Sequence, residues 1–237
     1  MQVKCFDSSA GRYHFVLEGI VTSSHAHPVA EVILAREGTF DLSLGEQLLS
    51  GLRFAIICPN EIHRLSAEAC MLEILMLESY NDTLEQYLQS SGMSPTGGCW
   101  LLPKGKDAAE AFASLLAFAE SVDLRSVSDS RVSQSIALLA EENTSYQERF
   151  EALREAIPLS ASRLSHLFKE HIGLSLKKYL LWCRLRQAIS LFLEGEDKLF
   201  EVAHRSGFYD QAHLSRAFTT ILGISPSQVY NSRTIQF

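Results

Sequence analysis

Residues 158–227 constrain this chain more than any other stretch, because the same short pattern occurs there twice, on either side of a long helical segment. In each copy a turn precedes a short helix whose apolar residues recur at helical spacing and so form one buried stripe. Ser160 is positioned to cap the first of these helices. The two stripes consist of Leu164, Leu167 and Phe168 in the first copy and Leu214, Ala217, Phe218 and Ile221 in the second.

The opposite sides of these two helices carry hydroxyl, amide, imidazole and guanidinium groups, where an ordinary surface helix usually carries Glu and Lys. Such groups can hydrogen bond to base edges in the major groove of DNA. The outward residues are Ser162, Ser165, His166 and Lys169 in the first helix and Gln211, Ala212, His213, Arg216 and Thr219 in the second.

Three segments of this region, SRLSHLFKEHIGLSLKKYL, RLRQAISLFLEG and EVAHRSGFYDQAHLSRAFTTILGISPSQV, together resemble the paired helix-turn-helix domain of AraC/XylS-family bacterial transcription regulators. The most characteristic marks are the turn at Gly207 and Phe208, the HLSRAF run and the GxSP motif that begins at Gly223. An all-α domain that matches only by amphipathic patterning does not account for both turns at the family's spacing. The resemblance implies a domain over residues 129–237 that binds promoter DNA, although residues 129–157 match the family only loosely.

The resemblance also implies which residues read bases. These are Ser162, Ser165 and His166 in the first helix and Gln211, Ala212, His213 and Arg216 in the second. By their chemistry, Arg216 can pair with guanine, Gln211 with adenine, and Ala212 can contact the thymine methyl group. Since the first helix has no Arg or Gln at these positions, we expect it to contribute less specificity.

Three further cations are candidate phosphate contacts, which position a protein on DNA without reading its sequence. They are Arg163, Lys169 and Arg184, and the alternative for each is an ordinary solvated charge. The helix expected over residues 175–193 would be ~28 Å long at ~1.5 Å per residue. That length is close to the ~34 Å of one DNA turn, so the two reading helices can enter successive major grooves.

Charge is distributed unevenly along the chain. From Pro158 onward there are ten Lys and Arg against six Asp and Glu, a net charge of +4, whereas the whole chain has −7 and the rest of it therefore −11. A basic end on an acidic body is expected if only one domain meets phosphate.

The N-terminal part reads as β-structure. Short apolar or alternating runs between residues 13 and 78 are separated by Gly, Pro, Asn and Ser, as in a β-sandwich or barrel. The runs are YHFVLEGIV, EVILAREGTFDLSL, LRFAIICP and CMLEILMLE.

Within this part, the spacing of Gly19, His25, His27, Glu31 and Gly38 resembles the first signature of the cupin barrel. His63, in PNEIHRL, lies where the second cupin signature supplies a third histidine. That second signature is degraded, since its Pro-to-His interval is one residue short and lacks the usual Gly. The resemblance implies a cupin-like β-barrel over residues 1–80.

The chemistry of these side chains suits a metal ion. His25 and His27 are two residues apart, so in a strand they project from the same face. Imidazoles combined with a carboxylate are ligands for a divalent transition metal. Two alternatives stay open, namely polar lining of an organic-effector pocket and purely structural histidines. The candidate metal-binding or effector-binding residues are His25, His27, Glu31 and His63.

Residues 81–128 are expected to be a mostly helical connector. It comprises a short helix over 81–92, a Gly/Pro-rich loop over 93–105 and an amphipathic helix over 106–123. The apolar stripe of the latter either packs on the barrel or pairs with a second protomer, and it consists of Phe112, Leu115, Leu116 and Ala119. The Ser-rich segment 125–130 is a candidate linker. Support helices over 129–142 and 145–157 would follow it.

The cysteines and the N-terminal segment indicate the cellular compartment of the protein. Five scattered cysteines without CxxC spacing argue against a disulfide framework or a zinc finger, which leaves buried thiols or a redox-sensing pair. No stretch reaches the ~18 apolar residues of a membrane span. The segment MQVKCFDSSAGRYHF lacks the pattern of a secretory signal, so we expect a cytoplasmic protein without a membrane partner.

The sequence therefore predicts a multidomain β + α protein, with a cupin-like barrel followed by an all-α domain of two helix-turn-helix units joined by a long helix. We expect a transcription regulator, not an enzyme, whose partners are promoter DNA and a small-molecule or metal effector. RNA polymerase would be a further partner of an activator. A metal-dependent cupin enzyme, of dioxygenase or isomerase type with a helical appendage, is the alternative. Activation or repression, and the monomer or homodimer state, stay open.

Overall fold

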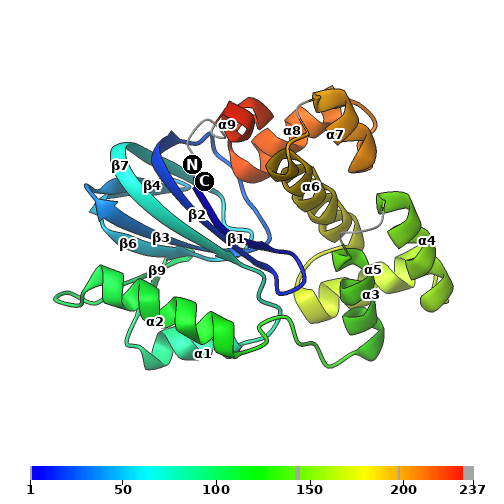
Figure 1. Ribbon diagram of the computed structural model, residues 1–237. Helices are drawn as coiled ribbons and strands as arrows, with labels where there is room; N and C mark the ends of the chain where they lie inside the picture. The colour runs from blue at the N-terminus through cyan, green and yellow to red at the C-terminus, as the bar shows by residue number, and fades with distance from the viewer. Residues whose placement is uncertain (1, 142–144, 197, 232–237) are drawn as a thin grey trace.

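A computed structural model describes residues 2–141, 145–196 and 198–231 of the chain. The strands occupy the N-terminal half and the helices of the C-terminal half lie beside them (Figure 1). This arrangement confirms the predicted fold class, an antiparallel β domain followed by an all-helical domain. None of the helices in these three ranges is long and apolar enough to cross a membrane.

The β domain is one antiparallel sheet. Nine strands are seen in the described residues: β1 (Gln2–Asp7), β2 (Arg12–Val21), β3 (Ala30–Glu37), β4 (Phe40–Leu44), β5 (Gln47–Leu52), β6 (Phe54–Ile57), β7 (His63–Leu77), β8 (Ser94–Thr96) and β9 (Cys99–Leu101). They pair in the order β1-β2-β7-β3-β6-β9-β8, and β4 pairs with both β5 and β7. The long strand β7 thus pairs with three others and holds the sheet together.

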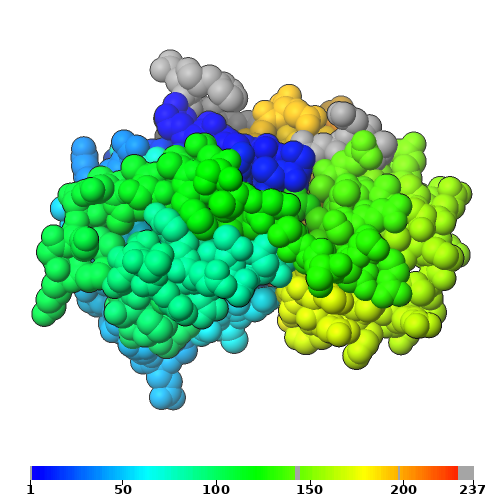
Figure 2. All heavy atoms as spheres, turned by 90° about the horizontal axis from the view of Figure 1, so that it is seen from below, coloured from blue at the N-terminus to red at the C-terminus, as the bar shows by residue number. Residues whose placement is uncertain are grey.

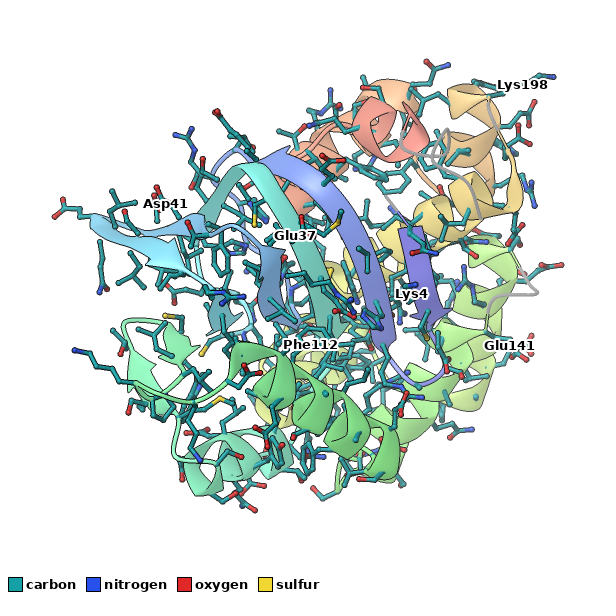
Figure 3. The ribbon with its side chains drawn as sticks, turned by 60° about the vertical axis from the view of Figure 1, so that its left-hand side comes forward. Lys4, Glu37, Asp41, Phe112, Glu141 and Lys198 are labelled. Carbon is teal, nitrogen blue, oxygen red and sulfur yellow. The ribbon has the colours of Figure 1, made fainter. Side chains whose placement is uncertain are left out.

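Strand β3 is buried on both faces, as expected for a sheet that is covered on both sides. Val32 and Leu34 face a layer formed by α1 (Thr83–Ser90) and α2 (Ala108–Ser121). Figure 3 shows Phe112 between α2 and the sheet, and Figure 2 shows α1 and α2 side by side over this surface. The predicted amphipathic helix therefore packs within the chain through Phe112, Leu115 and Ala119.

The C-terminal half contains α3 (Ser130–Ala140), α4 (Tyr146–Ala156), α5 (Ala161–Ile172), α6 (Leu176–Glu194), α7 (Leu199–Arg205), α8 (Gln211–Leu222) and α9 (Pro226–Asn231). Side-chain caps fix where several of them begin, because the oxygens of Ser145, Ser160 and Asp210 accept hydrogen bonds from first-turn N–H groups. Glu148 completes a capping box with Ser145. Gly173 and Gly223 end α5 and α8 in the left-handed conformation.

The two helix-turn-helix units differ in how they are buried. The first unit, α4 and α5 with their support helix α3, has its own apolar cluster around Phe168 and Tyr179. In the second unit, Leu214, Phe218 and Ile221 of α8 belong to the same apolar cluster as the interior of the sheet. The second unit is therefore docked on the β domain through a continuous core.

A buried carboxylate joins the two halves. Glu78, which follows β7, accepts hydrogen bonds from Trp182 Nε1 (2.8 Å) and Arg186 (2.6 Å) of α6. It also accepts from the Tyr13 hydroxyl (2.8 Å) and the Tyr80 hydroxyl (2.7 Å). The side chain of Glu78 is fully buried. These residues, together with Arg125, are called the Glu78 cluster below.

The cluster balances its charges. Arg125 Nε lies 3.4 Å from Glu78, and its guanidinium donates to the backbone oxygens of Ser8 (2.7 Å) and Ser9 (2.6 Å). Burial raises the pKa of Glu78, but Arg186, Arg125 and the hydrogen bonds lower it by more, so the net pKa lies below its ordinary value. Glu78 is thus an anion between two arginines.

Some sequence-based expectations are wrong in detail. The sequence pattern does not indicate strands β1 and β5, and β8 and β9 form a hairpin within the segment 93–105 that its Gly and Pro content predicts to be a loop. The candidate linker 125–130 is anchored at both ends, by Arg125 in the Glu78 cluster and by Asp129 as the cap of α3. Glu142, the predicted end of the first support helix, lies outside the described residues. The domain boundaries at residues 80 and 128 stay a prediction.

We predict that Glu78→Gln lowers the free energy of unfolding by about 3–5 kcal/mol, because it leaves buried arginines without a counter-charge. The measurement is urea unfolding of both proteins. The difference in unfolding free energy between the two proteins should be constant above pH 4.5, the ordinary pKa of a glutamate. It should shrink as the pH falls through the pKa of Glu78 in the folded protein, which is lower than 4.5.

Glu18→Gln is the matched control, since Glu18 is exposed on β2. It should change the stability by less than about 0.5 kcal/mol. Equal effects of the two substitutions would contradict a structural role for the Glu78 cluster.

Candidate ligand site and nucleic-acid interface

The four candidate residues of the β domain come together in the structure. His25, in the segment after β2, pairs through its backbone with His63 at the start of β7. His27 follows in the same segment, and Glu31 is contributed by β3. All four are buried, and the three histidines each present a ring nitrogen within 4.8 Å of the others. These four residues are called the His–Glu site below.

The backbone fixes the tautomer of each histidine. Nδ1 of His25 lies 2.9 Å from the Ser23 carbonyl oxygen, Nδ1 of His27 lies 3.0 Å from that of Val29, and Nδ1 of His63 lies 2.9 Å from that of Glu61. A carbonyl oxygen only accepts hydrogen bonds, so each Nδ1 carries the proton. The Nε2 atoms are then the ones that offer lone pairs to a shared ligand.

Glu31 supplies the negative charge of the site. Its Oε2 lies 3.2 Å from Nε2 of both His27 and His63. Burial raises the pKa of Glu31, but these two histidines lower it by more, and the net pKa is well below its ordinary value. Burial lowers the pKa of His63, while Glu31 raises it by more, so its net pKa is raised. Burial and the neighbouring His63 lower the pKa of His25 to about 4.

These residues fit a divalent transition metal. His63 Nε2 is buried and makes no hydrogen bond of acceptable geometry, despite its short distance to Glu31. A buried carboxylate surrounded by imidazoles needs a compensating positive charge, which is supplied either by protons or by a cation. Imidazole and carboxylate ligands suit zinc, iron, nickel, copper or manganese.

An apolar cavity of about 110 Å³ adjoins the His–Glu site. Its wall in the β domain includes Phe15, Ile74 and Met76, along with His25, His27 and Glu31. The rest of its wall comes from the C-terminal half: Trp182, Arg186 and Ile189 of α6, Leu222 of α8, and Ile224 just beyond it. The helical domain thus forms part of the cavity wall beside the site.

The two candidate reading helices, α5 and α8, expose most of the predicted residues. Ser162, His166, Gln211, Ala212 and Arg216 are all exposed. Helix α6 joins the two units and is buried along most of its length, so the connection is rigid. Its 19 residues correspond to ~28 Å, as predicted.

Other predicted DNA contacts have partners inside the protein. The Ser165 hydroxyl accepts a hydrogen bond from the N–H of Leu176, and His213 packs edge-on against Phe208. Lys169 Nζ donates to the carbonyl oxygen of Gly173 (3.0 Å) at the end of its own helix. These contacts support a role in holding each helix in place, and base reading by Ser165 and His213 stays a prediction.

The predicted phosphate contacts Arg163 and Arg184 lie in different surroundings. Arg163 is exposed on the first turn of α5. Arg184 is half-buried, with its guanidinium carbon 4.2 Å from the ring centre of Tyr146 on α4, a cation–π contact. Arg163 is therefore the more accessible of the two.

Sequence reasoning missed the contribution of α6 and α8 to the cavity, and it missed Glu78 and Arg186. One signal was available. Arg186 is flanked on the same helical face by Trp182 and Ile189, at i−4 and i+3, so a cation lies within an apolar stripe. Such a position indicates a buried ion pair.

The fold and the exposed helices define a two-domain helix-turn-helix protein with a buried candidate ligand site. Two solved structures of ToxT from Vibrio cholerae share this fold. ToxT from Vibrio cholerae O395 has a TM-score of 0.55 at 12% identity and covers 95% of this chain and 99% of its own. The unsaturated fatty acid-bound form from strain SCE256 has a TM-score of 0.52 at 13% identity, covering 92% and 94%. At these identities the likeness shows the fold alone.

The C-terminal region also matches at the level of sequence. Residues 153–232 match the family model described as "Helix-turn-helix domain". The HTH-type transcriptional activator RhaS of Salmonella schwarzengrund (strain CVM19633) is 32% identical over 105 residues, which are 44% of this chain and 37% of the relative. RhaS of Salmonella arizonae is 31% identical over the same shares. The match thus spans little more than a third of these relatives.

Residues 153–232 are thus similar to the helix-turn-helix domain of known transcription regulators. This match agrees with the resemblance of residues 158–227 to AraC/XylS-family regulators.

We predict that protein purified without a histidine tag contains or takes up about one equivalent of a divalent transition metal, lost in a His25→Ala/His27→Ala variant. Elemental analysis after incubation with the metal and desalting measures it. His204→Ala is the matched control, because His204 is exposed on α7, and it should keep the metal. Wild-type protein that stays metal-free would contradict the assignment.

Proposed function

We propose that this protein is a sequence-specific DNA-binding transcription regulator whose β domain binds an effector at the His–Glu site and in the adjoining cavity. The observation that carries the proposal is the pair of exposed helices, α5 and α8, on the two ends of a rigid α6. Their outward faces offer donors and acceptors suited to base edges. A separation of about one DNA turn suits two successive major grooves.

Two observations on related proteins support the proposal. The curated relatives are named HTH-type transcriptional activators, and residues 153–232 match a helix-turn-helix family model. ToxT, which shares the whole fold, is described bound to an unsaturated fatty acid. Promoter DNA and a small effector are therefore the partners we propose, with RNA polymerase as a further partner if the protein is an activator.

The effector class follows from the site. The nitrogen and oxygen ligands of the His–Glu site favour a divalent transition metal, alone or with a small organic ligand in the apolar cavity. At about 110 Å³ the cavity is smaller than the ~300–1,000 Å³ of typical small-molecule pockets. An organic effector as large as a fatty acid would need the helical domain to move away from the β domain. A metal ion needs no such movement.

The alternative function, a metal-dependent cupin enzyme, finds less support in the geometry. A catalytic site must admit a substrate beside its metal. Here Trp182, Leu222 and Ile224 of the helical half line the cavity next to the His–Glu site and leave only about 110 Å³. We therefore propose a regulatory role for this site.

DNA reading by Arg216 can be tested by binding-site selection followed by affinity measurement. We predict that Arg216→Ala costs ~1–3 kcal/mol on the selected site and relaxes the preference at one base position, because its bidentate pairing with guanine is lost. Arg53→Ala, an exposed arginine between β5 and β6, is the control and should leave both unchanged. An unaltered preference would remove Arg216 from the reading set, and failure to select any duplex would contradict the proposed function.

A phosphate contact by Arg163 makes a different prediction. Arg163→Ala should weaken binding equally on all duplexes and reduce the slope of log affinity against log salt by about 0.9, because one fewer counterion is released. Binding measured at several salt concentrations gives the slope. An unchanged slope would make Arg163 an ordinary surface charge.

A further inference from the structure

The second reading helix ends against the His–Glu site. The N–H of Ser23 donates to the carbonyl oxygen of Gly223, the residue that ends α8, at 2.8 Å. The Ser23 hydroxyl lies 3.2 Å from the same oxygen. Ser23 precedes His25 by two residues, so the chain segment that carries the first histidine is hydrogen-bonded to the reading helix.

The same residue, Ser23, also orients His25. Its carbonyl oxygen accepts the hydrogen bond from His25 Nδ1 (2.9 Å) that leaves Nε2 free for a metal. Two hydrogen bonds, joined through the backbone of Ser23, therefore connect the imidazole of His25 to Gly223.

Gly223 approaches the site so closely that only glycine fits. A Cβ added there would lie 2.5 Å from His25 Nδ1, 2.7 Å from the Ser23 carbonyl oxygen and 2.8 Å from Thr22 Cβ. Its φ of +68° also favours glycine, as usual for a residue that ends a helix. Gly173 ends the first reading helix with a similar φ of +73°, but a Cβ there would meet nothing within 4 Å.

We propose that metal binding at the His–Glu site and docking of α8 on the β domain are coupled, so that each strengthens the other. The inference rests on the metal-binding site proposed above and adds how that site is regulated. The docked helix supports the hydrogen bond that orients His25, although no residue of α8 is itself a ligand. Loss of the hydrogen bond that orients a metal-ligating histidine typically weakens metal affinity 10–100-fold.

The coupling acts on one reading helix and leaves the other unaffected. Helix α5 belongs to a separate apolar cluster, whereas α8 shares the core of the sheet. Metal occupancy would therefore fix the position of Gln211 and Arg216 relative to α5 and so set the spacing of the two reading helices. Because coupling free energies are reciprocal, the metal should stabilise docking by the same factor by which docking raises metal affinity.

The test compares Gly223→Ala with Gly173→Ala in the full chain. Both substitutions impose the same strain on a left-handed glycine at the end of a reading helix, but only the first collides with the His–Glu site. Zn²⁺ titration by calorimetry should show unchanged affinity in Gly173→Ala and at least tenfold weaker affinity in Gly223→Ala. Equal Zn²⁺ affinities in the two variants would overturn the coupling.

A second measurement tests the effect of the metal on the docking of α8. Zn²⁺ should slow hydrogen exchange of the α8 amides in wild type and in Gly173→Ala, and should slow it less in Gly223→Ala. If Gly223→Ala does not fold, Ile224→Ala takes its place, because Ile224 packs on the sheet interior without a left-handed backbone. Ile224→Ala should weaken Zn²⁺ binding severalfold, and an unchanged affinity would overturn the proposal.

The outcomes separate this inference from the proposed function. Wild-type protein that selects a duplex but binds no Zn²⁺ overturns the coupling and leaves DNA binding intact. Protein that shows the Zn²⁺ difference between the two glycine variants but selects no duplex supports the coupling and contradicts the regulator function.

Discussion

The buried carboxylate of Glu78 is the interaction on which the arrangement of the two halves depends. It accepts hydrogen bonds from β2 and α6 and forms an ion pair with Arg125 in the segment after α2, and these three parts are far apart in sequence. An anion in an apolar interior is unfavourable unless it is fully hydrogen-bonded and paired. Arg186 supplies a hydrogen bond and a counter-charge, and Arg125 a second counter-charge, only when α6 and the segment carrying Arg125 are docked. The cluster therefore specifies one orientation of α6 against the sheet, beyond what apolar contacts alone would select.

The orientation of α6 then decides the different roles of the two reading units. Towards its beginning, Tyr179 packs in the cluster of the first unit, and further along Ile189 and Phe192 join the core of the sheet. The first unit therefore has its own apolar core, while α8 packs against the apolar interior of the β sheet. The two copies of the repeated sequence pattern therefore lie in different environments, because only the second copy packs on the interior of the sheet.

Sequence reasoning recovered the features that local rules determine. Ser160 is predicted as a cap because capping depends on neighbours in the chain, and the resemblance to the cupin signature groups His25, His27 and Glu31. The expected strand around His25 and His27 is wrong, since both lie in the segment between β2 and β3. The docking of α8 and the partnership of Glu78 with Arg186 could not be predicted, since they join residues more than a hundred positions apart. The hairpin β8–β9 was missed because its Gly-Gly turn resembles the punctuation of a loop.

The two glycines that end the reading helices show why a local signal does not determine function. Gly173 and Gly223 have the same backbone conformation, follow the same kind of helix and precede similar residues. Local reasoning assigns both to helix termination, and for Gly173 that account suffices. For Gly223 a second constraint is added, because its missing side chain is the space that His25 and Ser23 occupy. The proposed signal between the β domain and DNA needs such a contact. The contact exists at one copy of the repeat because docking brings only that copy to the His–Glu site.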